Sequence, residues 1–256
     1  MKKILSILNK KNKSKIVCLT AYSKNIAKLI DDHCDLVLVG DSLANVLYGM
    51  KNTHQISMDI MLNHAKSARA GVKKSLLVVD MPKNSYKNPS SAVRNAKYLI
   101  KKSGCEAVKI ESNFKNSNII KALVKSKIAV MGHIGFTPQF KKKFSVQGTN
   151  LQNKKKLILD AKKIENAGAF SIVLECIKKE TAKQITQALK IPTIGIGSSN
   201  YCDGQVLVTE DLIGLSGFYP KFVKKYANIS KIIKKSVQKY RKEVISKRFP
   251  SKNNSY

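Results

Sequence analysis

The chain lacks any apolar run that approaches the ~20 residues needed to span a membrane. Its first ten residues faintly resemble a signal peptide, but their apolar core is too short and more lysines follow. The five cysteines are scattered and never spaced C-x-x-C, which argues against disulfides and zinc and predicts reduced thiols in a cytoplasmic protein. No Pro/Gly/Ser-rich linker divides the sequence. We therefore expect a single domain over residues 1–256, with a flexible C-terminal tail at 249–256.

Acidic residues are also scarce, with 16 Asp and Glu against 48 Lys and Arg, so the formal net charge is +32. Such a charge can indicate a nucleic-acid-binding surface. The lysines, however, are spread from Lys2 to Lys252 and greatly outnumber the arginines. Nucleic-acid readers favour arginine and concentrate their charge beside aromatic residues. We therefore expect a lysine-rich surface with no specific nucleic-acid partner, and at most a weak, salt-dependent association with DNA.

Common nucleotide and hydrolase motifs are missing too. The sequence contains no G-x-G-x-x-G, Walker A or G-x-S-x-G pattern. The glycine pair Gly195 and Gly197 could form an anion- or substrate-binding loop, but it is a weak signal and an ordinary tight turn is the better explanation.

What the chain does have is a regular alternation of short apolar stretches and helical patterns. The stretches predicted as strands are 15–21, 35–41, 75–80, 107–111, 128–133, 170–176, 193–196 and 205–208. The patterns predicted as helices are 24–32, 58–70, 91–102, 116–125, 155–167, 180–189 and 221–246, the last holding more than one helix. Eight strands separated mostly by helices predict an α/β protein, a (β/α)8 TIM barrel.

Four of the apolar runs within the predicted strands end in a carboxylate, at Asp41, Asp80, Glu111 and Glu175. Parallel strands in a barrel place these ends on one rim, where ligands bind. Four like charges there need a cation or a proton to offset them. A carboxylate set without a His/Cys pattern suits Mg²⁺ or Mn²⁺, so Asp41, Asp80 and Glu111 are the metal-ligand candidates. The alternative, that each acid caps a helix or pairs with a lysine, stays open.

Three further residues are candidates for chemistry. Lys109 lies two positions before Glu111 and so points to the same face of its strand, where it would bind a substrate carboxylate or form a buried ion pair. Glu175 could act as a general base, or it could be an ordinary strand-end acid. His133, between glycines, could donate to a substrate or be a structural histidine.

An ordered set of motifs over about residues 15–224 closely resembles one family. The motifs are LTAY at 19–22, VGDSL at 39–43, DMP at 80–82, VKIE at 108–111, GHIGFTPQ at 132–139, VQG at 146–148, LEC at 174–176, IGIG at 194–197 and CDGQVLV at 202–208. Together they resemble the ketopantoate hydroxymethyltransferases. The loops depart from the family pattern at Ala44, at 83–86, at Thr149 and at Ser198.

The resemblance implies a TIM-barrel enzyme of pantothenate biosynthesis. Such an enzyme transfers a hydroxymethyl group from 5,10-methylenetetrahydrofolate to 3-methyl-2-oxobutanoate, giving 2-dehydropantoate. By motif, the metal positions are Asp41, Asp80 and Glu111, the substrate positions are Asp41, Ser42, Asp80 and Lys109, and the proton acceptor is Glu175. One Mg²⁺ per subunit and a homodecamer are also implied. The competing hypothesis is a Mg²⁺-dependent 2-oxo-acid enzyme of the phosphoenolpyruvate mutase/isocitrate lyase type, whose Lys-Lys-Cys-Gly-His-like loop is missing here.

Overall fold

The computed structural model describes residues 1–141, 143–217 and 219–256, and its centre is a closed barrel of eight strands. Each strand pairs in parallel with the next along the chain, and β8 pairs with β1. The strands are β1 (Ile16–Thr20), β2 (Leu36–Val39), β3 (Leu76–Asp80), β4 (Ala107–Glu111), β5 (Ala129–Gly135), β6 (Ser171–Glu175), β7 (Thr193–Ile196) and β8 (Gly204–Leu207). The predicted (β/α)8 barrel is thereby confirmed.

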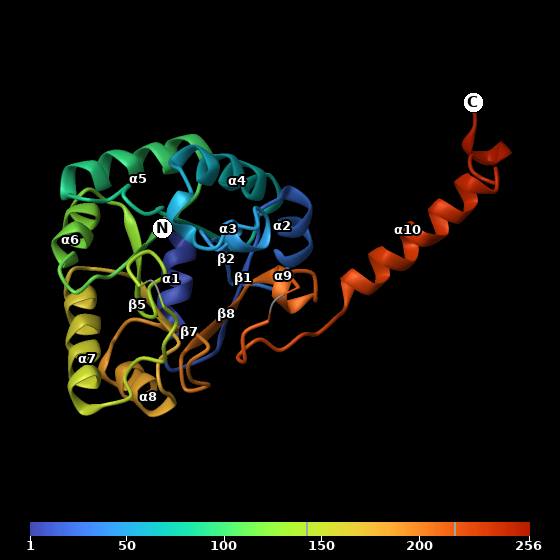
Figure 1. Cartoon of the computed structure of the whole chain (residues 1–256). Coiled ribbons are helices and arrows are strands. Elements are labelled where there is room, and N and C mark those ends of the chain that lie inside the picture. The colour runs from blue at the N-terminus through green and yellow to red at the C-terminus, as the bar shows by residue number, and fades with distance from the viewer. Residues whose placement is uncertain (142, 218) are drawn as a thin grey trace. The chain divides into compact units, whose positions relative to one another are not determined.

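Helices surround these strands on the outside (Figure 1). The helices up to residue 208 are α1 (Lys2–Asn9), α2 (Lys24–Ile30), α3 (Leu43–Val46), α4 (Met58–Gly71), α5 (Pro89–Ser103), α6 (Ser117–Lys125), α7 (Leu151–Asn166) and α8 (Lys179–Ala188), with a 3-10 turn, η1 (Thr53–Gln55). Local signals start two of them: Ser57 accepts the N–H of Ile60 before α4, and Asn88 caps α5 ahead of a proline at its first turn.

Side chains alternate between two apolar layers because strand residues point to opposite faces in turn. Leu36 and Leu38 of β2 belong to the cluster inside the barrel, whereas Val37 and Val39 belong to the cluster between strands and helices. Burial on both faces explains the unbroken apolar runs of the sequence.

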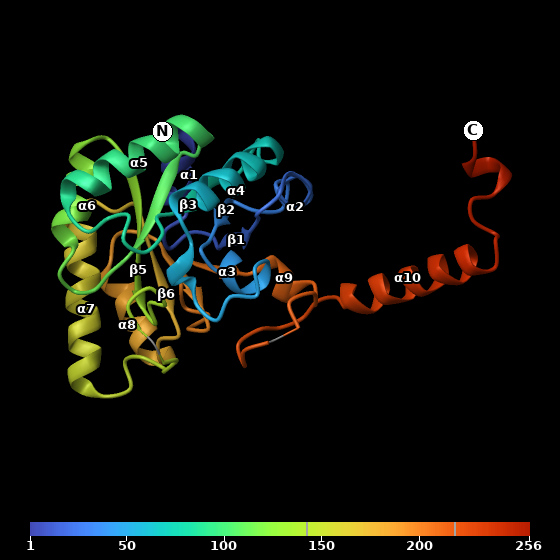
Figure 2. The same ribbon diagram turned by 45° about the horizontal axis from the view of Figure 1, so that its top comes forward.

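Helix α1, which the sequence patterns did not predict, covers the amino-terminal ends of the strands, hereafter the floor of the barrel. Its Ile7 is buried and joins the cluster inside the barrel. Lys3 donates to the carbonyl of Ser75, and the adjoining Lys10 and Lys11 pair with Asp35 and Asp203. Each of these three partners stands directly before a strand. Figure 2 shows the same structure from a second angle, in which α1 lies largely behind α5.

The chain divides into two compact units, Met1–Val208 and Thr209–Tyr256, and the first holds the whole barrel. The second contains α9 (Thr209–Leu212), α10 (Ile229–Ile245) and the 3-10 turn η2 (Lys252–Asn254). The stretch 221–246 contains one helix, α10, and the prediction that it holds more than one helix was wrong. The single domain over 1–256 and the flexible tail at 249–256 stay predictions. Within the part of the chain that the structure describes, no helix has the length and apolar character to cross a membrane.

Candidate active site

The four predicted acids all stand at the carboxyl-terminal ends of strands, hereafter the mouth of the barrel. Asp41 follows β2 by two residues, while Asp80, Glu111 and Glu175 are the last residues of β3, β4 and β6. The strand register places Lys109 beside Asp80 and His133 beside Glu111. Parallel pairing therefore brings together residues that are far apart in sequence.

Lys109 is buried inside this acidic group, as its position in an apolar strand predicted. Its Nζ lies 2.6 Å from Oδ1 of Asp80, and Oδ2 of Asp80 accepts the backbone N–H of Asp41 at 3.0 Å. Burial alone would lower the pKa of Lys109, but Asp80, Asp41 and Glu111 raise it overall. Lys109 is thus held in its charged form by the acids around it.

Gln139 links two of the acids and was not predicted as a site residue. Its side-chain Nε2 donates to Oδ2 of Asp41 at 2.8 Å, and its backbone N–H donates to Oε2 of Glu111 at 3.0 Å. Burial and then Asp80 raise the pKa of Asp41 to about 6. Burial and then Asp41 likewise raise the pKa of Glu111. Lys109 alone therefore does not balance the negative charge of the mouth.

His133 lies between Glu111 and Glu175. Its Nε2 is 3.2 Å from Oε2 of Glu175 and its Nδ1 is 3.6 Å from Oε1 of Glu111. Within the described ranges, neither contact has hydrogen-bond geometry, so both ring nitrogens are buried without a partner. Burial, helped by Lys109, lowers the pKa of His133 well below its usual value, which makes the ring neutral.

Glu175 differs from the other three acids in its contacts and exposure. Burial raises its pKa to about 8, although Lys109 opposes the shift. Its side chain keeps 18% of its surface exposed, so solvent moderates this effect while leaving the carboxylate reachable. A partly exposed carboxylate with a raised pKa has the properties of a general base.

Two hydroxyl residues complete the mouth near Asp41. Ser42, a predicted substrate residue, lies 2.8 Å from the hydroxyl of Tyr22 through its Oγ. Thr53 was not predicted; its buried side chain interacts with Asp41 and lowers the pKa of that carboxyl group. Both Tyr22 and Thr53 come from loops, where no periodic pattern marked them.

The mouth fits a magnesium ion in its chemistry. Among the residues whose positions are described, no three His, Cys, Asp or Glu side chains are close enough to enclose an ion by themselves. Mg²⁺ usually takes only one or two carboxylates and completes its shell with water and substrate. The donors here are all carboxylate oxygens, and burial followed by the negative charge of a neighbouring acid raises the pKa of Asp41 and of Glu111. The assignment of Asp41, Asp80 and Glu111 as ligands stays a prediction.

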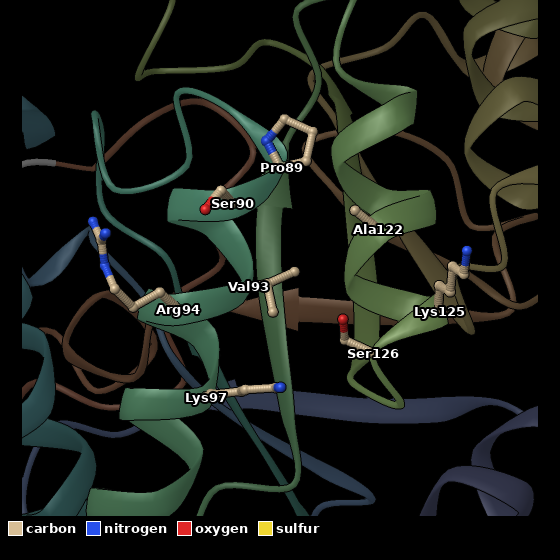
Figure 3. Close-up of a pocket in the computed structure, with 8 residues that line it drawn as sticks. All are labelled: Pro89, Ser90, Val93, Arg94, Lys97, Ala122, Lys125 and Ser126. Carbon is tan, nitrogen blue, oxygen red and sulfur yellow. The ribbon is translucent and has the colours of Figure 1, made fainter.

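A surface groove of about 530 Å³ lies elsewhere, between α5 and α6 (Figure 3). In that view Lys97 extends from α5 toward α6, whereas Arg94 and Lys125 point away from the groove. None of the predicted site residues lines it. The groove is therefore separate from the mouth.

Solved structures with the same barrel are distant in sequence. A crystal structure of phosphonopyruvate hydrolase with oxalate and Mg²⁺ matches with a TM-score of 0.64 at 12% identity, over 99% of this chain and 93% of that one. A 2,3-dimethylmalate lyase of the PEP mutase/isocitrate lyase superfamily matches with a TM-score of 0.56 at 17% identity, over 75% and 71%. At such low identity these likenesses establish the fold alone.

Curated relatives are much closer. The 3-methyl-2-oxobutanoate hydroxymethyltransferase of Pelagibacter ubique (strain HTCC1062) is 54% identical over 255 residues, covering 100% of this chain and 99% of the relative. The enzyme of the same name from Anaplasma marginale (strain Florida) is 44% identical over 256 residues, covering 99% and 92%. A family model described as ketopantoate hydroxymethyltransferase matches residues 2–252. The chain therefore belongs to the ketopantoate hydroxymethyltransferase family.

Proposed function

We propose that this protein transfers a hydroxymethyl group from 5,10-methylenetetrahydrofolate to 3-methyl-2-oxobutanoate, giving 2-dehydropantoate for pantothenate biosynthesis. The observation that carries the proposal is the mouth itself, where four carboxylates surround one lysine and only Glu175 is partly exposed. Full-length identity of 54% to a hydroxymethyltransferase supports the same conclusion. The alternative of a mutase or lyase is supported only by likeness of fold.

Substrate binding is assigned to Asp41, Ser42, Asp80 and Lys109. An ammonium group has three N–H donors, and Asp80 uses one of those of Lys109 at 2.6 Å. The remaining donors are available to the carboxylate of a 2-oxo acid. Ser42, held by Tyr22, offers a hydroxyl at the same rim.

One Mg²⁺ per subunit is proposed at Asp41, Asp80 and Glu111. A magnesium ion bound there would polarise the carboxylate and keto oxygens of the substrate as a Lewis acid. The donor chemistry of the mouth and its excess negative charge support this assignment. Glu175 is kept outside the ligand set because a base needs a free lone pair.

Glu175 is the proposed proton acceptor. It removes a proton from C3 of the substrate, and the electron pair left behind forms the enolate, which bonds to the methylene carbon of the folate. Both carbon–nitrogen bonds of that carbon break, water supplies the hydroxyl oxygen, and tetrahydrofolate leaves with the proton from C3 and one proton from water on its two nitrogens. Lys109 holds the substrate carboxylate and, being positively charged, favours the developing negative charge. His133, neutral and 3.2 Å from Glu175, is proposed to orient that carboxylate or to donate to substrate.

A homo-oligomer, a decamer by family resemblance, and a cytoplasmic location are proposed as well. Helix α10 supports the oligomer because no residue along it is buried, although Ile232, Val237 and Tyr240 are apolar. Five free cysteines among the described residues are consistent with a reducing compartment.

Deuterium exchange at C3 of 3-methyl-2-oxobutanoate, followed by NMR with and without Mg²⁺, tests the proposal without the folate. We expect Mg²⁺-dependent exchange that Glu175→Gln lowers by about 10²–10⁴-fold. A suitable control is Glu165→Gln, which changes an acid at the end of α7 whose partners are the N–H groups of Lys190 and Ile191. Absence of exchange with the folded wild-type protein would overturn the proposed mechanism.

A further inference from the structure

We propose that Gln139, with its side-chain amide locked by Tyr86, is a positioning residue that sets Asp41 and Glu111 for metal binding. The inference rests on the proposed function, because it assumes that the mouth binds Mg²⁺. Its basis is a set of contacts that converge on one buried amide side chain.

The orientation of the Gln139 amide follows from the chemistry of its neighbours. Nε2 lies 3.1 Å from the carbonyl oxygen of Met81 and 2.8 Å from Oδ2 of Asp41. A carbonyl oxygen can only accept, so the group that faces both oxygens must be the NH₂. Oε1 then faces the hydroxyl of Tyr86, which donates to it at 2.5 Å. Every polar atom of the side chain therefore has a complementary partner.

Tyr86 is itself fixed in place. Its ring is buried and packs edge-on against Phe140, with ring centroids 6.5 Å apart. A flip of the amide is opposed because the flipped oxygen would face two acceptors, the Met81 carbonyl and Oδ2 of Asp41, and because the Tyr86 hydroxyl holds Oε1 in its present place.

The backbone around Gln139 holds the other acid. Its N–H donates to Oε2 of Glu111 at 3.0 Å. The loop reaches this place through Gly135, whose φ of +101° and close approach to the carbonyl of Glu175 leave no room for a side chain. Gln139 thus binds Asp41 through its side chain and Glu111 through its main chain.

The contacts of Gln139 therefore occupy one carboxylate oxygen of Asp41 and one of Glu111. Within the described ranges, the hydrogen bonds to these two carboxylates use Oδ2 of Asp41 and Oε2 of Glu111. Gln139 itself makes no contact with the opposite oxygens, Oδ1 of Asp41 and Oε1 of Glu111, so the proposal assigns these two to the ion; Oε1 lies 3.6 Å from Nδ1 of the neutral His133. Without the amide, Asp41 would lose the contact that orients it beside Asp80, and binding an ion would first require ordering that carboxylate.

The test is the Mg²⁺ affinity of the substrate-free, full-length protein, measured by isothermal titration calorimetry. We expect Gln139→Leu to weaken Mg²⁺ binding by about 10–100-fold, the usual effect of losing a group that orients a metal ligand. Gln139→Glu, which places an acceptor against Asp41, is expected to weaken binding at least as much. The main-chain contact to Glu111 is preserved in both variants.

Tyr86→Phe provides a milder variant that keeps Gln139 and removes only the lock on its amide. We expect a several-fold loss of Mg²⁺ affinity. Thr186→Val is the matched control, because it removes a buried hydroxyl that contacts Thr193 and the Ala182 carbonyl away from the mouth. Its Tm is expected to fall while its Mg²⁺ affinity stays at the wild-type value.

Two results would overturn the inference in distinguishable ways. If wild type binds Mg²⁺ and both Tyr86→Phe and folded Gln139→Leu bind it equally well, the positioning role is wrong and the proposed function stands. If Gln139→Leu does not fold, unchanged affinity in Tyr86→Phe alone has the same meaning. If wild type binds no Mg²⁺, the proposed function and this inference fail together.

Discussion

The two ends of the barrel use the same residue types with opposite charge balance. At the floor, Asp35, Glu106 and Asp203 each pair with a lysine from the amino-terminal segment, at 2.5–3.0 Å. At the mouth, the four acids Asp41, Asp80, Glu111 and Glu175 surround Lys109, which forms an ion pair with Asp80 at 2.6 Å. The floor acids are therefore paired with cations of the chain itself, whereas the proposed function assigns the mouth acids to a bound ligand. On that proposal, the floor contributes to stability and the mouth to function.

The floor acids also join neighbouring strands. Asp35, which precedes β2, accepts the N–H of Val17 in β1, and Asp203, which precedes β8, accepts the N–H of Thr193 in β7. Glu106 accepts the N–H of Leu77 in the same way. Each floor carboxylate therefore has a backbone donor and a cation, and this full set of partners marks a structural role.

The largest expected effect is the loss of a floor ion pair. Lys11→Met would leave Asp203 without its cation in a site where the two side chains are only 9% and 5% exposed, and we expect unfolding to become easier by about 3 kcal/mol. Urea denaturation measures the change, with Lys155→Met on the exposed face of α7 as control. An unchanged free energy of unfolding would contradict a stabilising role of the floor. A large drop in C3-proton exchange in the folded variant would show that the floor also affects the proposed function.

The pH profile of C3-proton exchange tests the mouth. A proton acceptor works in its deprotonated form, and burial raises the pKa of Glu175 to about 8, so the rate should rise with pH and level off above that value. Below it we expect about a tenfold fall per pH unit. Lys109 stays charged throughout because its pKa is raised. A profile that is flat from pH 6 to 9 would remove Glu175 as the base.

Asp80→Asn and Asp35→Asn make the same chemical change at the two ends. Asp80→Asn removes the negative charge beside Lys109, and we expect Mg²⁺ affinity to fall about tenfold or more. Asp35→Asn weakens the contact with Lys10 and is expected to lower Tm with no change in Mg²⁺ affinity. Calorimetry and thermal unfolding on both variants check this, and Asp80→Asn with wild-type affinity would exclude Asp80 from the ligands.

The smallest effect is expected for a solvent-exposed ion pair beside the floor. Lys74 contacts Asp32 at 2.8 Å, but their side chains are 74% and 63% exposed. Exposed pairs contribute little because water screens them. Lys74→Ala should leave both Tm and exchange rate at wild-type values, and a measurable loss in either would show that surface charge matters more here than the comparison allows.

The sequence predicted the eight strands well because a strand buried on both faces is an unbroken apolar run. It also predicted Asp41, Asp80, Glu111 and Glu175 at one rim, since parallel strands share a direction. The roles of these residues were inferred from family resemblance and remain proposals.

The missed features depend on contacts between distant segments. Gln139, Tyr86 and Thr53 are polar loop residues, and only folding brings them to Asp41. Helix α1 was missed because its apolar residues Ile4, Ile7 and Leu8 are buried only once the barrel has closed and they pack against its interior. The sequence pattern at 221–246 predicted too much helix, because the helix in this stretch, α10, begins only at Ile229.

Helix α1 also limits the order in which the barrel can be completed. Its adjoining Lys11 is separated by 192 residues from Asp203, and Lys3 by 103 residues from Glu106. During synthesis α1 and the adjoining Lys11 are made long before β8, so Lys11 cannot pair with Asp203 until most of the chain has been made. Contacts this distant in sequence are slow to form. The full set of contacts made by this segment can therefore form only after β8 has been synthesised, although the partners of Lys3 and Lys10 are made earlier.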